Sequence, residues 1–164
     1  MTASAFCRAA LAAALLSLAA CATASSEPSR WALAPDPAPV LSFSAKGSDT
    51  PGYRLSCDAG ATRLAAWVPG VPRGTAADAA PFPARLRVFL GRTELDLGAT
   101  ATPTPGAETM VEAPLPDAAG FFEALKRNGR LVTVTFAGRG MAPVPAADLV
   151  NRFQQQCTAL ARQG

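Results

Sequence analysis

Two close pairs of side chains are the candidates for catalysis in this sequence. Ser44 and Lys46 have the minimum that a Ser-Lys nucleophile pair needs, and Glu94 and Asp96 have the same spacing for a pair of carboxylates. Alternate residues of a strand also share its solvent face, and a working carboxylate pair needs one member desolvated so that its pKa rises. Both pairs are therefore interpreted as solvated strand residues.

The rest of the catalytic inventory is sparse. The chain of 164 residues contains no histidine, the commonest general base and metal ligand. It has no G-x-S-x-G motif and no glycine-rich phosphate loop, and its cysteine spacing fits no zinc motif. The sequence predicts no metal and no cofactor, and it disfavours an enzyme.

A group of arginines with one tryptophan is a more distinctive candidate. Arg63 and Trp67 alternate with aliphatic residues in one segment, and Arg85 and Arg87 do so in another. If these segments paired as antiparallel strands, all four side chains would share one face, where guanidinium groups bind carboxylate or phosphate and aromatic rings stack on sugars. The alternative is that a C-terminal helix covers the aromatic residues and the arginine stems lie around its edge.

Period-two alternation of apolar and polar residues indicates strands. The predicted strands are residues 41–46, 53–58, 62–68, 85–90, 93–97, 108–113 and 131–136, with a short edge segment at 141–144 after a turn at 138–140. Turn residues at 47–52 and 91–92 predict two hairpins, and the proline-rich stretch 69–83 predicts a long loop.

Helical spacing appears in two places. Residues 117–128 carry Asp117 as a predicted N-cap, and the pair Asn128-Gly129 is predicted to end this helix in the left-handed conformation. Residues 145–162 carry an apolar stripe that includes Phe153 and Cys157. The fold class is therefore mainly β with helices: a twisted antiparallel sheet or a two-layer β-sandwich of about seven strands, with the C-terminal helix packed on it.

The N-terminus reads as an export signal. After Arg8 comes an Ala/Leu run that ends in Leu18-Ala19-Ala20-Cys21, and this run is shorter than the about 20 residues that span a bilayer. Residues 1–21 resemble the signal and lipobox of bacterial lipoproteins. The resemblance implies cleavage before Cys21, acylation of Cys21 and a membrane anchor, with the outer membrane favoured because Ala22 follows. The alternative is an ordinary signal cut after residues 22–24, which gives a soluble periplasmic protein.

The predicted organisation is a signal peptide at 1–20, a lipidated Pro/Ser/Ala tether at 21–39 and one domain at 40–164. Trp31 is predicted to dock from the tether onto the domain. Loss of Arg8 leaves 14 basic against 12 acidic residues, a balance that predicts no nucleic-acid partner. With Cys7 removed and Cys21 acylated, Cys57 and Cys157 are predicted to form a disulfide in an oxidising compartment.

These observations favour a lipid-anchored protein of the cell envelope with a binding or structural role, whose partner is an envelope protein or an anionic glycan. An inhibitor of an exported hydrolase is the alternative, with the loop from Val71 to Ala80 as its probe. A carboxylate-dependent hydrolase is the least favoured. The mature portion also resembles small periplasmic proteins of proteobacteria, with a tryptophan near its start and a phenylalanine before its final cysteine, and this likeness implies no function.

Overall fold

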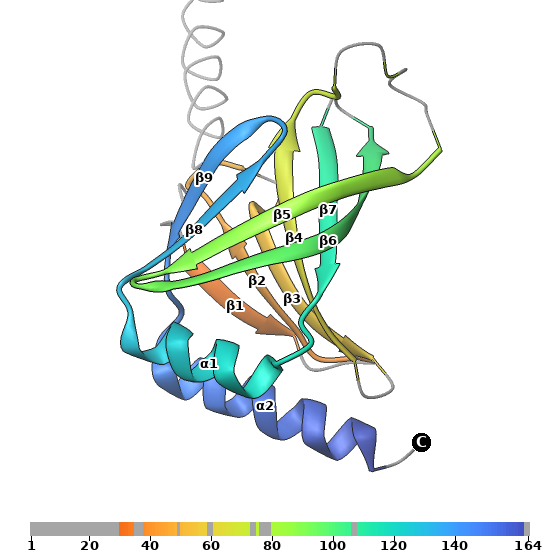
Figure 1. Cartoon of the computed structure of the whole chain (residues 1–164). Coiled ribbons are helices and arrows are strands. Elements are labelled where there is room, and N and C mark those ends of the chain that lie inside the picture. The colour runs from red at the N-terminus through yellow and green to blue at the C-terminus, as the bar shows by residue number, and fades with distance from the viewer. Residues whose placement is uncertain are drawn as a thin grey trace, which may run out of the picture.

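Nine antiparallel strands form one curled sheet in the computed structural model of the protein, which describes residues 30–34, 38–48, 50–58, 61–72, 75, 80–105 and 108–162. The strands are β1 Arg30–Ala34, β2 Val40–Ser44, β3 Tyr53–Asp58, β4 Ala61–Pro69, β5 Phe82–Leu90, β6 Thr93–Thr104, β7 Glu108–Pro114, β8 Arg130–Thr135 and β9 Gly138–Pro143. The predicted mainly β class is confirmed, as one continuous sheet (Figure 1).

Alternation gives the sheet an inner apolar face. In β3 the buried residues Tyr53, Leu55 and Cys57 alternate with the partly exposed Arg54 and Ser56. The same pattern recurs on the other strands, and the inward side chains form one core. Because the sheet curls, this single face encloses the core on several sides, so no second sheet is needed to cover it.

The strand order is β1-β2-β3-β4-β7-β6-β5-β8-β9. Both predicted hairpins are present, as β2–β3 and β5–β6. The pairing of residues 62–68 with 85–90, on which the arginine patch depended, is wrong: β4 pairs with β3 and β7, and β5 pairs with β6 and β8. The chain leaves β4 through a proline-rich connection and returns as β5, three strand positions away, with β7 and β6 in between.

The first strand lies inside the predicted tether. Residues 30–34 pair with β2, so the domain extends at least to Arg30 and the tether does not include this stretch. Trp31 docks as predicted: it is buried, its ring lies 5.5 Å from that of Phe43, and its indole N–H donates to the Pro143 carbonyl at 2.7 Å. That bond joins edge strand β1 to edge strand β9. The predictions for the signal peptide, for Cys21 and for tether residues 22–29 concern residues outside the described ones.

The two predicted helices are present as α1 (Ala118–Arg127) and α2 (Ala147–Ala161), and they lie together across one end of the curled sheet (Figure 1). Asp117 caps α1 by accepting the Gly120 N–H at 2.9 Å. The predicted left-handed end is wrong, because Asn128 is extended and its side-chain amide donates to the Ala124 carbonyl at 2.6 Å. A side-chain cap therefore replaces the backbone reversal.

Two local details complete the fold. The turn between β8 and β9 is Phe136-Ala137, and Gly138 and Gly140 belong to β9 rather than to the turn. Cys57 at the end of β3 and Cys157 of α2 form a disulfide across 100 residues of sequence. The described helices include none that is long and apolar enough to cross a membrane.

Candidate functional site

The four residues predicted as one binding patch lie in two separate clusters. All four point away from the core, as the alternation predicted, but β7 and β6 stand between their strands. Three strand spacings of about 4.8 Å put β4 and β5 roughly 14 Å apart before the curl of the sheet is counted. Arg63 and Trp67 therefore do not share a contact site with Arg85 and Arg87.

In the first cluster, Arg63 and Trp67 are joined by Arg54 and Glu112, and the four side chains contact one another. The Arg54 guanidinium lies 5.3 Å from the centre of the Trp67 ring, and its Nη2 is 3.5 Å from Glu112. Arg63 reaches the other oxygen of Glu112 at 3.9 Å. Arg54 thus covers the tryptophan, whereas α2 contributes its buried residues Val150 and Phe153 to the core. The predicted helix cover over this aromatic is not what the structure has.

The second cluster consists of two exposed ion pairs between β5 and β6. Arg85 binds Asp96 through Nε at 3.0 Å and Nη2 at 2.6 Å, and Arg87 binds Glu94 through the same two nitrogens at 3.2 and 2.6 Å. The hydrogen bond and charge of Asp96 raise the pKa of Arg85, and Glu94 does the same for the pKa of Arg87. Both arginines stay charged, and the carboxylates hold them in fixed orientations.

The two pairs that were weighed as catalytic candidates, Glu94 with Asp96 and Ser44 with Lys46, lack a catalytic environment. Glu94 and Asp96 are each 49% exposed and bound to an arginine, and the hydrogen bond from Arg85 lowers the pKa of Asp96. A general acid at neutral pH needs the opposite shift. Ser44 ends β2, while Lys46 lies in the following turn, so these two residues do not share a strand face.

A groove lies beside the second cluster, where β5 meets β8. Its volume is about 540 Å³, within the range of roughly 300–1,000 Å³ that small ligands occupy. The rings of Phe82 and Phe136 form part of it, with centroids 6.2 Å apart. We name it the β5–β8 groove; it is lined by the apolar residues Pro72, Phe82, Pro83, Ala84, Val134 and Phe136 and by the polar residues Thr75, Arg85, Arg87 and Thr135.

The groove offers two kinds of contact side by side. Phe136 is 41% exposed, one of two large apolar side chains that are so exposed among the described residues. Arg85 and Arg87 stand next to it, with side chains 65% and 48% exposed. An apolar surface next to oriented guanidinium groups suits a ligand that has an apolar body and a carboxylate or phosphate.

Sequence reasoning found the two arginines and missed the aromatic residues. Phe82 stands between Pro81 and Pro83, in a stretch predicted as loop, and Phe136 was assigned to the end of a strand rather than to a turn. An aromatic residue between prolines, where a loop would carry polar residues, was the available signal. Of the predicted inhibitory loop from Val71 to Ala80, most residues lie outside the described ones.

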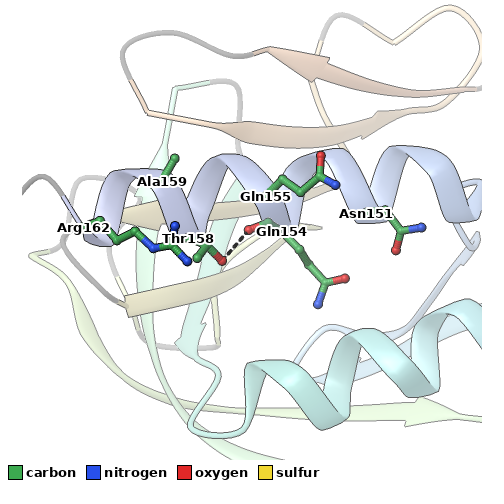
Figure 2. A pocket seen from close by; sticks show the side chains of 6 residues that line it. All are labelled: Asn151, Gln154, Gln155, Thr158, Ala159 and Arg162. Carbon is green, nitrogen blue, oxygen red and sulfur yellow. Dashed lines mark hydrogen bonds between the residues drawn. The ribbon is translucent and has the colours of Figure 1, made fainter.

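A second hollow, of about 470 Å³, lies along α2 and is a weaker candidate. Figure 2 shows that its side chains come from one helix and spread along it rather than converge. The hydrogen bond between them is internal to the helix, from the Thr158 hydroxyl to the Gln154 carbonyl at 2.9 Å. This surface is the polar side of an amphipathic helix, as the stripe through Phe153 and Cys157 predicted.

Within the described part of the chain, no group of three or more acidic, cysteine or histidine residues is placed to hold a metal ion. No family model, no curated protein and no solved structure matches this chain, so the interpretation of the groove depends on its own geometry.

Proposed function

We propose that this chain is a lipid-anchored binding protein of the bacterial cell envelope. Cys21 carries the lipid, and the β5–β8 groove binds a segment of another envelope protein that has apolar and acidic side chains. The observation that carries the proposal is the combination, in one groove, of exposed Phe136 with the oriented guanidinium groups of Arg85 and Arg87.

Two features support an envelope location. The residues that end in Cys21 resemble a lipobox. The Cys57–Cys157 disulfide belongs to an oxidising compartment, because thiols in the bacterial cytoplasm are kept reduced. Two or three acyl chains on Cys21 would satisfy the requirement for more than one hydrophobic anchor in stable attachment.

The lining of the groove favours a protein segment over a glycan. Six of its ten residues are apolar, and apolar side chains of a partner would displace water from them. Each arginine uses Nε and Nη2 on its own carboxylate, while a guanidinium has five N–H donors in all. The donors on Nη1 remain for an acidic side chain of the partner.

The groove is tested by cross-linking in the native envelope. A photo-reactive phenylalanine at position 136 places the probe where an aromatic ring already lies, and the same residue at Gln155, exposed on α2, is the matched control. We expect a discrete protein adduct from position 136 only, and we expect Arg85→Gln/Arg87→Gln to abolish it. Equal adducts at both positions, or an adduct at position 136 that persists in Arg85→Gln/Arg87→Gln, would contradict the proposal.

The charge of the groove gives a second test, in which two double variants should change the affinity in opposite directions. Glu94→Gln/Asp96→Asn frees both guanidinium groups and should strengthen binding of the cross-linked partner, whereas Arg85→Gln/Arg87→Gln should weaken it, in both cases more at low salt than at high salt. Affinity is measured by titration with the purified partner, and thermal melts check that each variant folds. Binding of purified peptidoglycan or lipopolysaccharide with the same dependence on charge would favour the anionic glycan instead.

The anchor is tested by metabolic labelling. We expect labelled palmitate on the wild-type chain, and we expect Cys21→Ser to lose the label and to leave an unprocessed or soluble product. The small residues before Cys21 fit the requirement of a lipoprotein peptidase that the resemblance implies. Equal label on both chains would exclude Cys21 as the acylated residue.

A further inference from the structure

Residues 124–147 carry only positive charges. Between Glu123 and Asp148 there are four basic residues and no acidic residue. Two of the four, Arg130 and Arg139, lie on the β8–β9 hairpin, and among the described residues neither forms an ion pair. The hairpin therefore presents positive charge that the rest of the described fold does not neutralise.

Strand register places these arginines beside apolar side chains on the outer face of the sheet. Phe89, Val132 and Met141 form one row across β5, β8 and β9. Arg139 stands in the neighbouring row, opposite Val134. We name the surface of Phe89, Arg130, Val132, Arg139 and Met141 the β8–β9 face; none of these five residues lines the β5–β8 groove.

The β8–β9 face is exposed and uneven. Met141 is 58% exposed, the other large apolar side chain that stands out among the described residues. Arg130 borders two hollows, of about 340 and 440 Å³, one beside Met141 and the other beside Phe89. A protruding apolar side chain flanked by unpaired arginines is the combination by which proteins contact the interface of an anionic bilayer.

The position of the anchor brings a membrane to this face. Arg30, the first described residue, comes nine positions after Cys21, and a fully extended chain of this length spans at most about 30 Å. Arg30 precedes Trp31, whose indole binds Pro143 at the end of β9. A lipid on Cys21 would thus keep β9 close to the bilayer, where even weak docking is favoured by the high effective concentration.

From these observations we infer that the β8–β9 face docks on the anionic surface of the bilayer that holds the anchor. This inference rests on the proposed acylation of Cys21. A second copy of the chain fits the face less well, because a symmetric contact would bring the same unpaired arginines together. Docking would fix the orientation of the domain and leave α2 on another side of the molecule.

Met141 supplies a native probe. The acylated chain that begins at Cys21 is reconstituted in vesicles of phosphatidylcholine, alone or mixed with phosphatidylglycerol. Peroxide oxidation of Met141 is followed by mass spectrometry, with the partly buried Met110 as internal reference. We expect oxidation of Met141 to slow in the anionic vesicles only, and high salt to reverse the effect. Arg130→Gln and Arg139→Gln should each lower the docking equilibrium constant, as deduced from the protection, about fivefold. This factor corresponds to the attraction of one basic residue to an anionic leaflet.

The controls are Arg152→Gln on α2 and Arg162→Gln at its C-cap, which each remove one arginine away from the face and should leave the protection intact. Unchanged oxidation of Met141 on a chain whose Cys21 peptide carries lipid would overturn the docking and leave the anchor standing. A Cys21 peptide without lipid would refute the anchor and the docking with it. Protection that rises with protein concentration in detergent, or that appears equally in neutral vesicles, would assign the face to another occupant and overturn the inference.

Discussion

The hydroxyl of Tyr53 lies 2.9 Å from that of Thr133 inside the curled sheet and links β3 to β8. Tyr53 is 5% exposed, and its burial raises the pKa of the phenol above its ordinary value, an effect that the hydrogen bond to Thr133 partly offsets. Since the chain has a single tyrosine, the absorbance of tyrosinate reports on this residue alone.

The raised pKa of Tyr53 predicts a loss of stability in alkali. Above about pH 10 an unfolded chain ionises its tyrosine, while the folded chain still holds the proton. The contribution of Tyr53 is therefore fully present below the unfolded pKa and is lost as the pH rises through the folded pKa. An absorbance titration should show tyrosinate only at a pH above that of the urea-unfolded chain.

Tyr53→Phe is the matched variant for this prediction. At neutral pH it should lower the free energy of unfolding by about 1 kcal/mol, because the Thr133 hydroxyl loses its partner. Above pH 10 its stability should fall less steeply than that of the wild type. Parallel pH profiles for the two chains would show that Tyr53 ionises as freely in the folded state as in the unfolded one.

At the scale of elements, β9 packs closely because Gly140 has no side chain. A Cβ atom at Gly140 would lie 2.5 Å from the Tyr53 hydroxyl and 3.1 Å from the Thr133 hydroxyl. Gly140→Ala should therefore cost about 1–3 kcal/mol of unfolding free energy, measured by urea titration. Gly98→Ala in β6 is the control, since nothing lies within 4 Å of its added Cβ, and it should be neutral or slightly stabilising. Equal losses from both would mean that the contact with Tyr53 does not limit the approach of β9.

The elements themselves were predictable where the pattern is local. Alternation indicated β2 to β8 and helical spacing indicated α1 and α2, because each signal needs only the neighbouring residues. β1 was missed because its residues lie in a proline- and serine-rich stretch. It becomes a strand through pairing with β2 and through Trp31, which binds Pro143 more than a hundred residues away.

The sequence predicted which charged residues of the candidate site point outward, but it did not predict which of them lie together. Alternation sent Arg63, Trp67, Arg85 and Arg87 outward, which is a local property. Whether they meet depends on strand order, and no local pattern encodes that β7 and β6 separate β4 from β5. The groove arose instead from the pairing of β5 with β8, which brings Phe136 to Phe82.

At the scale of the whole molecule, the disulfide joins the sheet to the last helix. Closing a loop of about 100 residues lowers the conformational entropy of the unfolded chain. This effect stabilises the folded state by at most roughly 4.7 kcal/mol. Cys57→Ser/Cys157→Ser should lower the melting temperature, and hydrogen exchange should show α2 opening first, because its remaining hold is one apolar stripe. Reductant should destabilise the wild type and have no effect on the double variant. An unchanged melting temperature, or two titratable thiols in the folded protein isolated without reductant, would refute the bridge.

The placement of α2 near the C-terminal end of the sequence also determines when the core and the disulfide can be completed. Phe153 and Val150 are fully buried in the core, and Cys57 finds its partner only at Cys157, so neither the core nor the bridge can be completed before nearly all of the chain has been delivered. If the chain is exported as proposed, Cys57 emerges before Cys157 and would wait as a free thiol for 100 residues to follow. In that interval the nearest other thiol in the chain is that of Cys21. Acylation of Cys21, besides fixing the protein to a surface, would remove this competitor and leave Cys57 with one partner.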